Sequence, residues 1–281
     1  MTLPPTAGPV APAHAAATVG RDMTVLRLLF VCTGNICRSA MGEGLGRSYL
    51  RGLLGEAADD IRLVSAGTRA VAGSAMHPRS ALVISGFGGD PGGFVARQLE
   101  PGMVTEADLV LTLTRDHRRE VLELVPRALA RTFTLREAAA LLGALGEGQP
   151  EGAGFADRAR GLVAALAAAR PGRRGEVGDD IADPIGRSLE GHEEVGQAVA
   201  DALLPVLASL VSLHPEIEED VVPAPVRIAA HLDRGGADDA AERPGAGNGS
   251  LPPALDHRTA GPGRARRAFG AFGRRRRPAS S

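Results

Sequence analysis

Residues 26–39 read LRLLFVCTGNICRS, a nearly continuous apolar run that stops abruptly at small polar residues. Such a run is typical of a β-strand buried on both faces, as in a parallel sheet. Apolar side chains then recur at four-residue spacing, which predicts a helix over residues 39–54. They are Met41, Leu45, Tyr49 and Leu53. The stretch therefore predicts a buried strand, a tight loop and a helix, in that order.

The same alternation continues along the chain. Further strands are predicted over residues 61–65, 107–112 and 132–135. Further helices are predicted over residues 78–85, 115–124, 136–145, 155–170 and 190–213, the last with a kink at Pro205. This order implies right-handed crossovers and an α/β fold, an open doubly wound sheet of about four parallel strands with helices on both faces. Ligands of such sheets bind beyond the carboxyl ends of the strands, where the loop at residue 32 lies.

The two ends of the chain differ in composition from the middle. Residues 1–22 are rich in Ala and Pro, without a charged start or a leucine-type apolar run, so we expect a disordered tail and no signal peptide. Residues 214–281 are first acidic and then Arg-rich, and we expect a second disordered tail. The folded domain is therefore predicted over residues 23–213. The Arg-rich run is expected to be solvated, with contact to an anionic surface as the alternative.

Charge and cysteine content exclude several classes of protein. The chain has 281 residues and a formal net charge of −1, so we expect no nucleic-acid partner. Two cysteines cannot staple a small secreted fold, and no second Cys/His pair follows them, so we expect no metal and no other cofactor. Free thiol chemistry indicates a reducing compartment, and we expect the cytoplasm. His77, His117 and His192 are scattered along the chain and are expected at surface or capping positions.

Cys32 and Arg38 lie six positions apart at the predicted strand-to-helix turn. Both can face one small dianion while the backbone between them points its N–H groups inward, at the N-terminus of a helix. Gly34 and Asn35 suit the left-handed backbone angles that such a loop needs. The residues expected to surround the anion are Thr33, Gly34, Asn35, Ile36, Cys37 and Ser39.

This arrangement predicts phosphoryl transfer through a covalent cysteine intermediate. The inward amides favour the thiolate form of Cys32, which is the nucleophile. Arg38 offers a planar fork that matches two phosphoryl oxygens. Ser39 can donate a hydrogen bond to the sulfur and ease its departure in the second step.

A general acid is needed because the leaving group of a phosphomonoester requires a proton. The polar loop over residues 179–187 contains three candidates, Asp179, Asp180 and Asp183. Asp183 precedes Pro184, which favours an extended, stiffened backbone at that position. The same carboxyl would later remove a proton from water when the phosphocysteine is hydrolysed.

The stretch VCTGNICRSAM at residues 31–41 resembles the signature loop of the low-molecular-weight protein tyrosine phosphatases. The similarity extends over residues 23–213 through SAGT at 65–68, ARQL at 96–99, ADLVLTLT at 107–114 and the Asp-Pro at 183–184. The resemblance implies Cys32 as nucleophile, Arg38 as transition-state clamp and Asp183 as acid. It also implies that Asn35, Ser39 and Ser65 hold the loop by hydrogen bonds. The implied activity is metal-independent hydrolysis of phosphomonoesters, by default protein phosphotyrosine, and the implied partner in bacterial members is a tyrosine autokinase.

The sequence departs from the family pattern in several places. Ala40 and Gly42 replace the usual Pro and Ala, with little expected chemical effect. Ile185-Gly186-Arg187 follow the Asp-Pro where the family often has aromatic residues, so stacking on a substrate ring is lost. The related arginine phosphatases usually carry Thr at the position of Ile36, so Ile36 argues against that activity.

Two other functions and a second role for Cys37 stay open at this stage. An arsenate reductase shares the fold and the loop, but this chain has no further cysteines, so it would need an external small thiol. A non-catalytic phosphate-binding module is the second alternative, although binding alone needs no acid. Cys37 is either a small buried side chain or a resolving thiol that protects oxidised Cys32.

Overall fold

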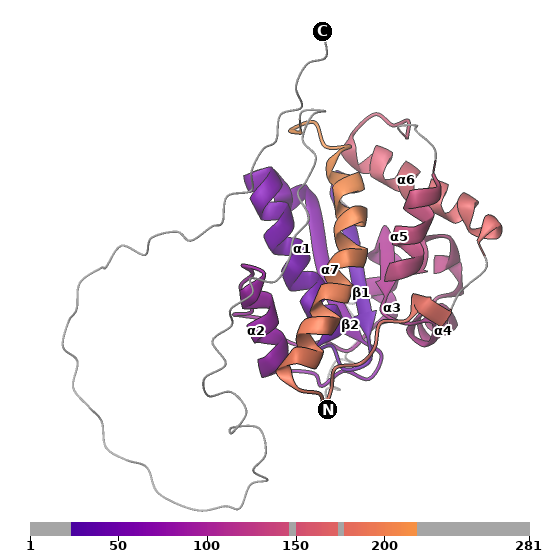
Figure 1. Ribbon diagram of the computed structural model, residues 1–281. Coiled ribbons are helices and arrows are strands. Elements are labelled where there is room, and N and C mark those ends of the chain that lie inside the picture. Colours follow the sequence, from indigo (N-terminus) through magenta and orange to yellow (C-terminus); the bar gives the residue numbers. More distant parts are fainter. Residues whose placement is uncertain (1–23, 146–149, 174–176, 218–281) are drawn as a thin grey trace, which may run out of the picture.

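The computed structural model describes residues 24–145, 150–173 and 177–217 (Figure 1). Both predicted tails fall outside these residues, except for positions 214–217 at the start of the second one. The domain boundaries at residues 23 and 213 therefore stay predictions.

Four parallel strands form the centre of the molecule, as predicted. They are β1 (Leu26–Cys32), β2 (Ile61–Gly67), β3 (Leu109–Thr112) and β4 (Thr132–Thr134), in the spatial order β2-β1-β3-β4. Cys32 lies in register with Gly67 of β2, and its neighbour Val31 with Thr112 of β3. The carboxyl ends of these strands thus meet at one edge, directly below the Cys32 loop.

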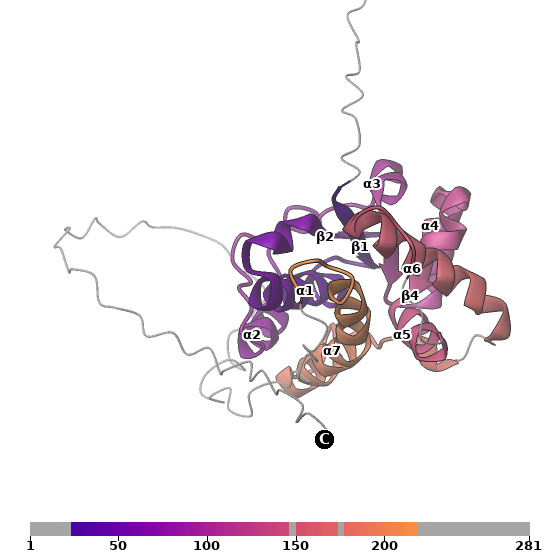
Figure 2. The same cartoon turned by 90° about the horizontal axis from the view of Figure 1, so that it is seen from above.

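Helices cover both faces of the sheet (Figure 2). They are α1 (Arg38–Leu54), α2 (Pro78–Gly86), α3 (Pro101–Glu106), α4 (Arg115–Leu124), α5 (Leu135–Ala144), α6 (Phe155–Ala169) and α7 (Leu189–Val211). Short 3₁₀ turns are η1 (Gly55–Asp60), η2 (Pro126–Arg131), η3 (Arg170–Gly172) and η4 (Val177–Asp179). Leu28 and Phe30 of β1 pack into the core with α1, α5 and α7, whereas Leu29 and Val31 pack towards α3 and α4. This two-sided burial explains the unbroken apolar run of β1.

Several predicted boundaries were wrong by one or two residues. The first helix begins at Arg38, and β2 continues to Gly67. The third strand begins at Leu109, because Asp108 uses its carboxylate to accept the Arg27 amide and to pair with Arg160. Leu135 belongs to α5, because Thr134 caps that helix through a capping box. The six-residue helix α3 was not predicted, because it is too short to show periodicity.

The closing helix α7 runs for 23 residues and continues through Pro205. Within the described ranges it is the one helix long and apolar enough to cross a membrane, with a mean hydropathy of 1.4 in its most apolar window. However, 56% of that window is buried inside the fold, where α7 packs on α1, α2 and α5. Packing in the core therefore accounts for the apolar character of α7.

Candidate active site

The loop after β1 forms a cradle of backbone amides. Its carbonyl groups at Cys32, Thr33, Gly34 and Ile36 face outward, because each accepts a hydrogen bond from the segment after β2. The donors are the amides of Thr68, Arg69, Val71 and His77, at 2.9, 3.0, 3.0 and 2.8 Å. In a trans peptide the N–H points opposite to the C=O of the preceding residue. The amides of residues 33, 34, 35 and 37 therefore point into the cradle.

Asn35 fixes the shape of this cradle. Its backbone is left-handed, with φ of 55°, and its side-chain amide nitrogen donates to Ser39 Oγ at 2.9 Å and to Ser65 Oγ at 2.8 Å. Its side-chain oxygen accepts the Arg97 amide at 2.7 Å. Gly67 allows the close approach of β2, because a Cβ there would lie 2.4 Å from the carbonyl oxygen of Thr33. This geometry agrees with the loop-holding roles that the resemblance gives to Asn35, Ser39 and Ser65.

The sulfur of Cys32 lies at the base of the cradle and is buried. Ser39 Oγ is 2.9 Å from Sγ, and the Asn35 amide donates to Sγ at 3.3 Å. Because Ser39 Oγ already accepts from Asn35, its own hydrogen is available to the sulfur. Both contacts stabilise negative charge on Cys32, as a thiolate nucleophile requires.

Behind Asn35 lies a buried carboxylate that the sequence analysis missed. Glu43 of α1 accepts a hydrogen bond from the Ser65 hydroxyl at 2.5 Å and pairs with Arg47 and Arg97. A chain of polar contacts thus runs from the protein surface through Glu43, Ser65 and Asn35 towards the sulfur. An acidic residue one helical turn after Ser39, on the same face of α1, was the available signal.

Arg38 begins α1, and its guanidinium is buried beside the cradle. One terminal nitrogen donates to the carbonyl of Ile181 at 3.2 Å, and the other forms an ion pair with Asp183. Its Nε is buried and has no hydrogen-bond partner among the described residues. Buried donors normally have partners, so Nε is placed to serve a phosphoryl oxygen.

The three candidate acids occupy different environments. Asp179 is buried and paired with Arg173 at 2.8 and 2.5 Å. Asp180 accepts the Arg115 amide at 2.7 Å, at the start of α4. The carboxylate of Asp183 is 45% exposed and contacts Arg38. Of the three, Asp183 is the one that reaches the catalytic loop.

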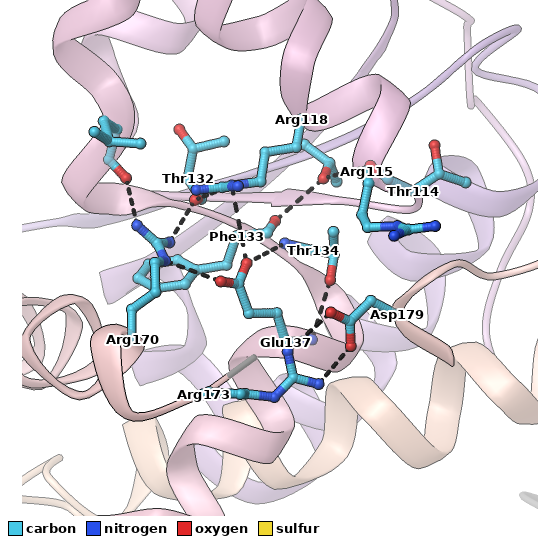
Figure 3. A network of polar contacts seen from close by, with 12 residues as sticks. Thr114, Arg115, Arg118, Thr132, Phe133, Thr134, Glu137, Arg170, Arg173 and Asp179 are labelled. Carbon is cyan, nitrogen blue, oxygen red and sulfur yellow. Dashed lines mark hydrogen bonds and ion pairs between the residues drawn. The ribbon is translucent and has the colours of Figure 1, made fainter. Parts of the chain in front are cut away.

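Further contacts anchor the segment that carries Asp183. The Ile181 amide donates to the carbonyl of Leu113 at 2.8 Å, and Arg136 donates to the carbonyl of Gly178 at 2.9 Å. Figure 3 shows the Arg173–Asp179 pair next to a second pair, Arg170 with Glu137, at 2.9 Å. Arg136 lies in α5, Arg170 directly follows α6, and Arg173 directly follows η3. The segment over residues 179–187, called the acid loop below, is therefore held by elements far from the cradle in sequence.

His117, expected at a surface or capping position, is buried beside the cap of α4. Its Nε2 lies 2.8 Å from Thr33 Oγ1, and its Nδ1 lies 2.9 Å from Thr114 Oγ1, the cap of α4. Burial, with the nearby Arg38 charge, lowers the pKa of His117 to about 4. A neutral ring therefore links the cap of α4 to the cradle. This role was not predictable from the sequence, because the bond to Thr33 spans 84 positions.

The structure also places His192, expected at a surface or capping position, in the interior, and brings it to His77 and Cys37. Cys37 is buried, as its structural interpretation requires. Burial raises the pKa of the Cys37 thiol to about 11. Its role as a resolving thiol stays a prediction.

One exposed aliphatic side chain lies beside Gly34 of the cradle, and another lies two residues after Asp183. Val71 and Ile185 are each about half exposed. Gly34 lies between Ile36 and Val71, because a Cβ on it would contact their side chains at 3.5 and 3.7 Å. These residues can contact the body of a substrate whose phosphoryl group lies in the cradle.

Comparison with known proteins identifies relatives of this arrangement. The family model described as low molecular weight phosphotyrosine protein phosphatase matches residues 27–141. The probable low molecular weight protein-tyrosine-phosphatase EpsP of Ralstonia solanacearum is 34% identical over 110 residues, which is 39% of this chain and 70% of that protein. A protein-arginine-phosphatase of Geobacillus stearothermophilus is 32% identical over 111 residues, covering 40% of this chain and 70% of that protein.

Solved structures also resemble the chain. The tyrosine phosphatase AmsI of Erwinia amylovora is 22% identical with a TM-score of 0.47, covering 65% of this chain and 91% of that one. The YwlE arginine phosphatase of Geobacillus stearothermophilus is 25% identical with a TM-score of 0.49, covering 66% of this chain and 94% of that one.

Proposed function

Because this chain belongs to the low molecular weight phosphotyrosine protein phosphatase family, we propose that it hydrolyses phosphotyrosine in proteins through a phosphocysteine at Cys32. The observation that carries the proposal is the meeting of a nucleophile, a clamp and an acid around one amide cradle. Ser39 and the Asn35 amide hold the sulfur of Cys32, and Arg38 contacts Asp183 beside it.

In the first step, the thiolate of Cys32 attacks phosphorus as the bond to the leaving oxygen breaks. Asp183 gives its proton to that oxygen, and the inward amides and Arg38 stabilise the charge on the equatorial oxygens. In the second step, water attacks the phosphocysteine, Asp183 takes the proton, and the sulfur–phosphorus bond breaks. The Ser39 hydroxyl then stabilises the departing thiolate, and inorganic phosphate leaves.

The contact between Arg38 and Asp183 describes the resting enzyme. A bound phosphoryl group competes for the same guanidinium, whose Nε has no hydrogen-bond partner among the described residues. Binding of substrate therefore releases Asp183 from Arg38 as the leaving oxygen arrives. The carboxylate of an ion pair carries no proton, so the released Asp183 first takes one from solvent and then gives it to the leaving oxygen.

Turnover of p-nitrophenyl phosphate in the presence of EDTA is the first test. We expect full activity with the chelator and loss of activity in Cys32→Ser. The rates of dephosphorylation of a phosphotyrosine peptide and a phosphoarginine peptide with the same flanking sequence then identify the substrate. We expect the rate on the phosphotyrosine peptide to be higher. A faster phosphoarginine peptide, or arsenate reduction with an external thiol, would contradict the proposal.

We further propose that the substrate is a tyrosine autokinase in the cytoplasm. A nucleophilic thiol must stay reduced to act, and a reducing compartment provides that condition. A phosphoproteome comparison after deletion should show raised tyrosine phosphorylation on such a kinase. Cell fractionation should recover the protein with cytoplasmic markers, and recovery elsewhere would contradict this location.

A further inference from the structure

Three side chains with metal-ligating atoms meet beside the catalytic loop. Cys37 is the N-cap of α1, His77 is the N-cap of α2, and His192 lies in the first turn of α7. Their ligand atoms all lie within 4.8 Å of one another. The cluster is thus made by three helix N-termini that come from distant parts of the chain.

Two buried ring nitrogens in this cluster have no hydrogen-bond partner among the residues that the structure describes. His192 is 0% exposed, and its Nδ1 lies 2.9 Å from Ser80 Oγ, but its Nε2 has no hydrogen-bond partner in the described ranges. The same is true of His77 Nδ1. A buried polar atom without a partner is uncommon in a folded protein and often marks a bound water or ion.

Both rings are in the form that binds metals. Burial lowers the pKa of His192 to about 4 and also lowers the pKa of His77, which favours the neutral form of both rings. Burial raises the pKa of Cys37 to about 11, so its proton must leave when a metal binds.

We propose that Cys37, His77 and His192 form a three-ligand site for Zn²⁺ or a similar divalent transition metal. One thiolate and two imidazoles make a ligand set that zinc prefers over magnesium or calcium. Ligand atoms around tetrahedral zinc lie roughly 3.3–3.6 Å apart, given Zn–N and Zn–S bonds of about 2.0–2.3 Å. The ligand atoms must therefore move closer together.

The two rings now stack at 4.6 Å with an angle of 16° between their planes. A metal lies in the plane of each imidazole that binds it, so one ring must turn out of the stack. His77 is the ring placed to turn, because it is only partly buried, whereas His192 is fully buried and contacts Ser80.

Metal binding at this site inhibits the enzyme. Cys37 is the residue before Arg38, so pulling its sulfur towards the histidines displaces the cradle. The ion also adds positive charge near Asp183, which interacts electrostatically with both Cys37 and His192. The catalytic steps need no metal, and this site would regulate them.

Cobalt binding to the full chain with Cys32→Ser tests the site directly, because Cys37 is then its sole thiol. We expect Co²⁺ to produce a thiolate-to-cobalt charge-transfer band in the near ultraviolet at one equivalent, and Zn²⁺ to remove it by competition. Adding Cys37→Ser should abolish the band. Adding His77→Gln or His192→Gln should weaken Co²⁺ binding at least tenfold.

His214→Gln in the same background is the matched control, because His214 is also buried but lies beyond the other end of α7 and contacts Asp60. It should bind Co²⁺ as tightly as Cys32→Ser alone. If His192→Gln fails to fold, His77→Gln decides the result. No charge-transfer band, or a band that neither histidine substitution weakens, would overturn the site.

Inhibition by Zn²⁺ of the enzyme with Cys32 intact tests the claim that metal binding at this site lowers activity. The inhibition constant for Zn²⁺ should rise at least tenfold in His77→Gln, measured against that variant's own rate without zinc. An unchanged inhibition constant would mean that zinc acts at Cys32, and the regulatory claim would be wrong. The cobalt experiment needs no turnover, so its result is independent of the proposed phosphatase activity.

Discussion

In the proposed mechanism Cys32 supplies the nucleophile, whereas the backbone around it binds the anion, so one substitution can separate the two properties. Cys32→Ser removes the thiolate but leaves the inward amides and Arg38 in place. We expect turnover to fall below about a hundredth of the unsubstituted rate, while vanadate still binds measurably. Steady-state kinetics and vanadate calorimetry check the two parts. Retention of a higher rate would exclude the covalent mechanism.

The loss of rate on removing the acid at Asp183 is expected to increase with the basicity of the leaving group. Asp183→Asn keeps the size of the side chain but cannot donate a proton. Its rate on p-nitrophenyl phosphate should fall modestly, because nitrophenolate leaves unaided. Its rate on phenyl phosphate or a phosphotyrosine peptide should fall by about two to four orders of magnitude.

Asp180→Asn is the control for that experiment, since Asp180 contacts the start of α4 rather than Arg38. It should change both rates little and show no dependence on the leaving group. If Asp180→Asn showed that dependence and Asp183→Asn did not, the acid would be Asp180.

Residues close together in sequence were the most predictable part of the site. Cys32, Arg38 and Ser39 belong to one loop, so their spacing alone suggested a phosphate cradle. Choosing Asp183 over its neighbours needed the family resemblance. His117 was not predictable, because its partner Thr33 lies 84 positions away, and Glu43 was missed although its partner Ser65 lies 22 away.

At the scale of elements, the acid loop depends on the pair between Arg173 and Asp179. Asp179→Asn removes one charge from the pair and should destabilise the fold by about 1–3 kcal/mol, because Arg173 is partly exposed and its charge stays partly in water. A looser acid loop should lower the rate of hydrolysis of phenyl phosphate more than that of p-nitrophenyl phosphate. This difference between the two substrates should have the same direction as in Asp183→Asn but be smaller. Thermal unfolding and the two rates are the measurements.

The exposed pair between Arg187 and Glu194 gives a matched control on α7. Glu194→Gln should change stability by less than about 1 kcal/mol, because both side chains are largely in water. Equal effects of Asp179→Asn and Glu194→Gln would show that the buried pair does not hold the loop.

Helix α4 was predicted with both of its ends, whereas several other elements were predicted with ends wrong by one or two residues. The unbroken apolar run of β1 and the periodic apolar residues of α7 allowed these elements to be recognised locally. The start of β3 depends on Asp108, whose partners Arg27 and Arg160 come from other elements. Boundaries set by such tertiary contacts leave no signal in the local sequence.

For the molecule as a whole, the buried histidines predict a loss of stability in acid. The pKa of His117 and of His192 is about 4 in the folded protein, below the usual 6.5. Below pH 6.5 the unfolded chain therefore binds more protons than the folded one, and stability falls as the pH drops from 6.5 to 4. Each ring should contribute on the order of 2 kcal/mol to this loss.

Urea unfolding at several pH values measures this effect. His117→Gln removes one of the two titrating rings, so its stability should fall less steeply between pH 6.5 and 4. A variant with the same slope as the unsubstituted protein would show that the ring is not held neutral by the fold.

Residues 23–214 should fold and function without the rest of the chain. The sheet, the cradle and the acid loop all lie within this range, so a protein trimmed to it should keep its rate on p-nitrophenyl phosphate within about twofold. Circular dichroism and steady-state kinetics provide the measurements. Loss of the fold would show that the predicted domain boundaries are misplaced.

The outward carbonyls of the cradle have a consequence for how this enzyme can change. Anion recognition rests mainly on backbone N–H groups, which substitution of their own side chains leaves in place, apart from Pro. The cradle recognises the phosphoryl group and carries no information about the molecule attached to it. That information lies in rim residues such as Val71 and Ile185, which are half exposed. New substrates can therefore arise by mutation of the rim while the chemistry stays intact, and the affinity for free phosphate, the product, should stay the same whatever the rim selects.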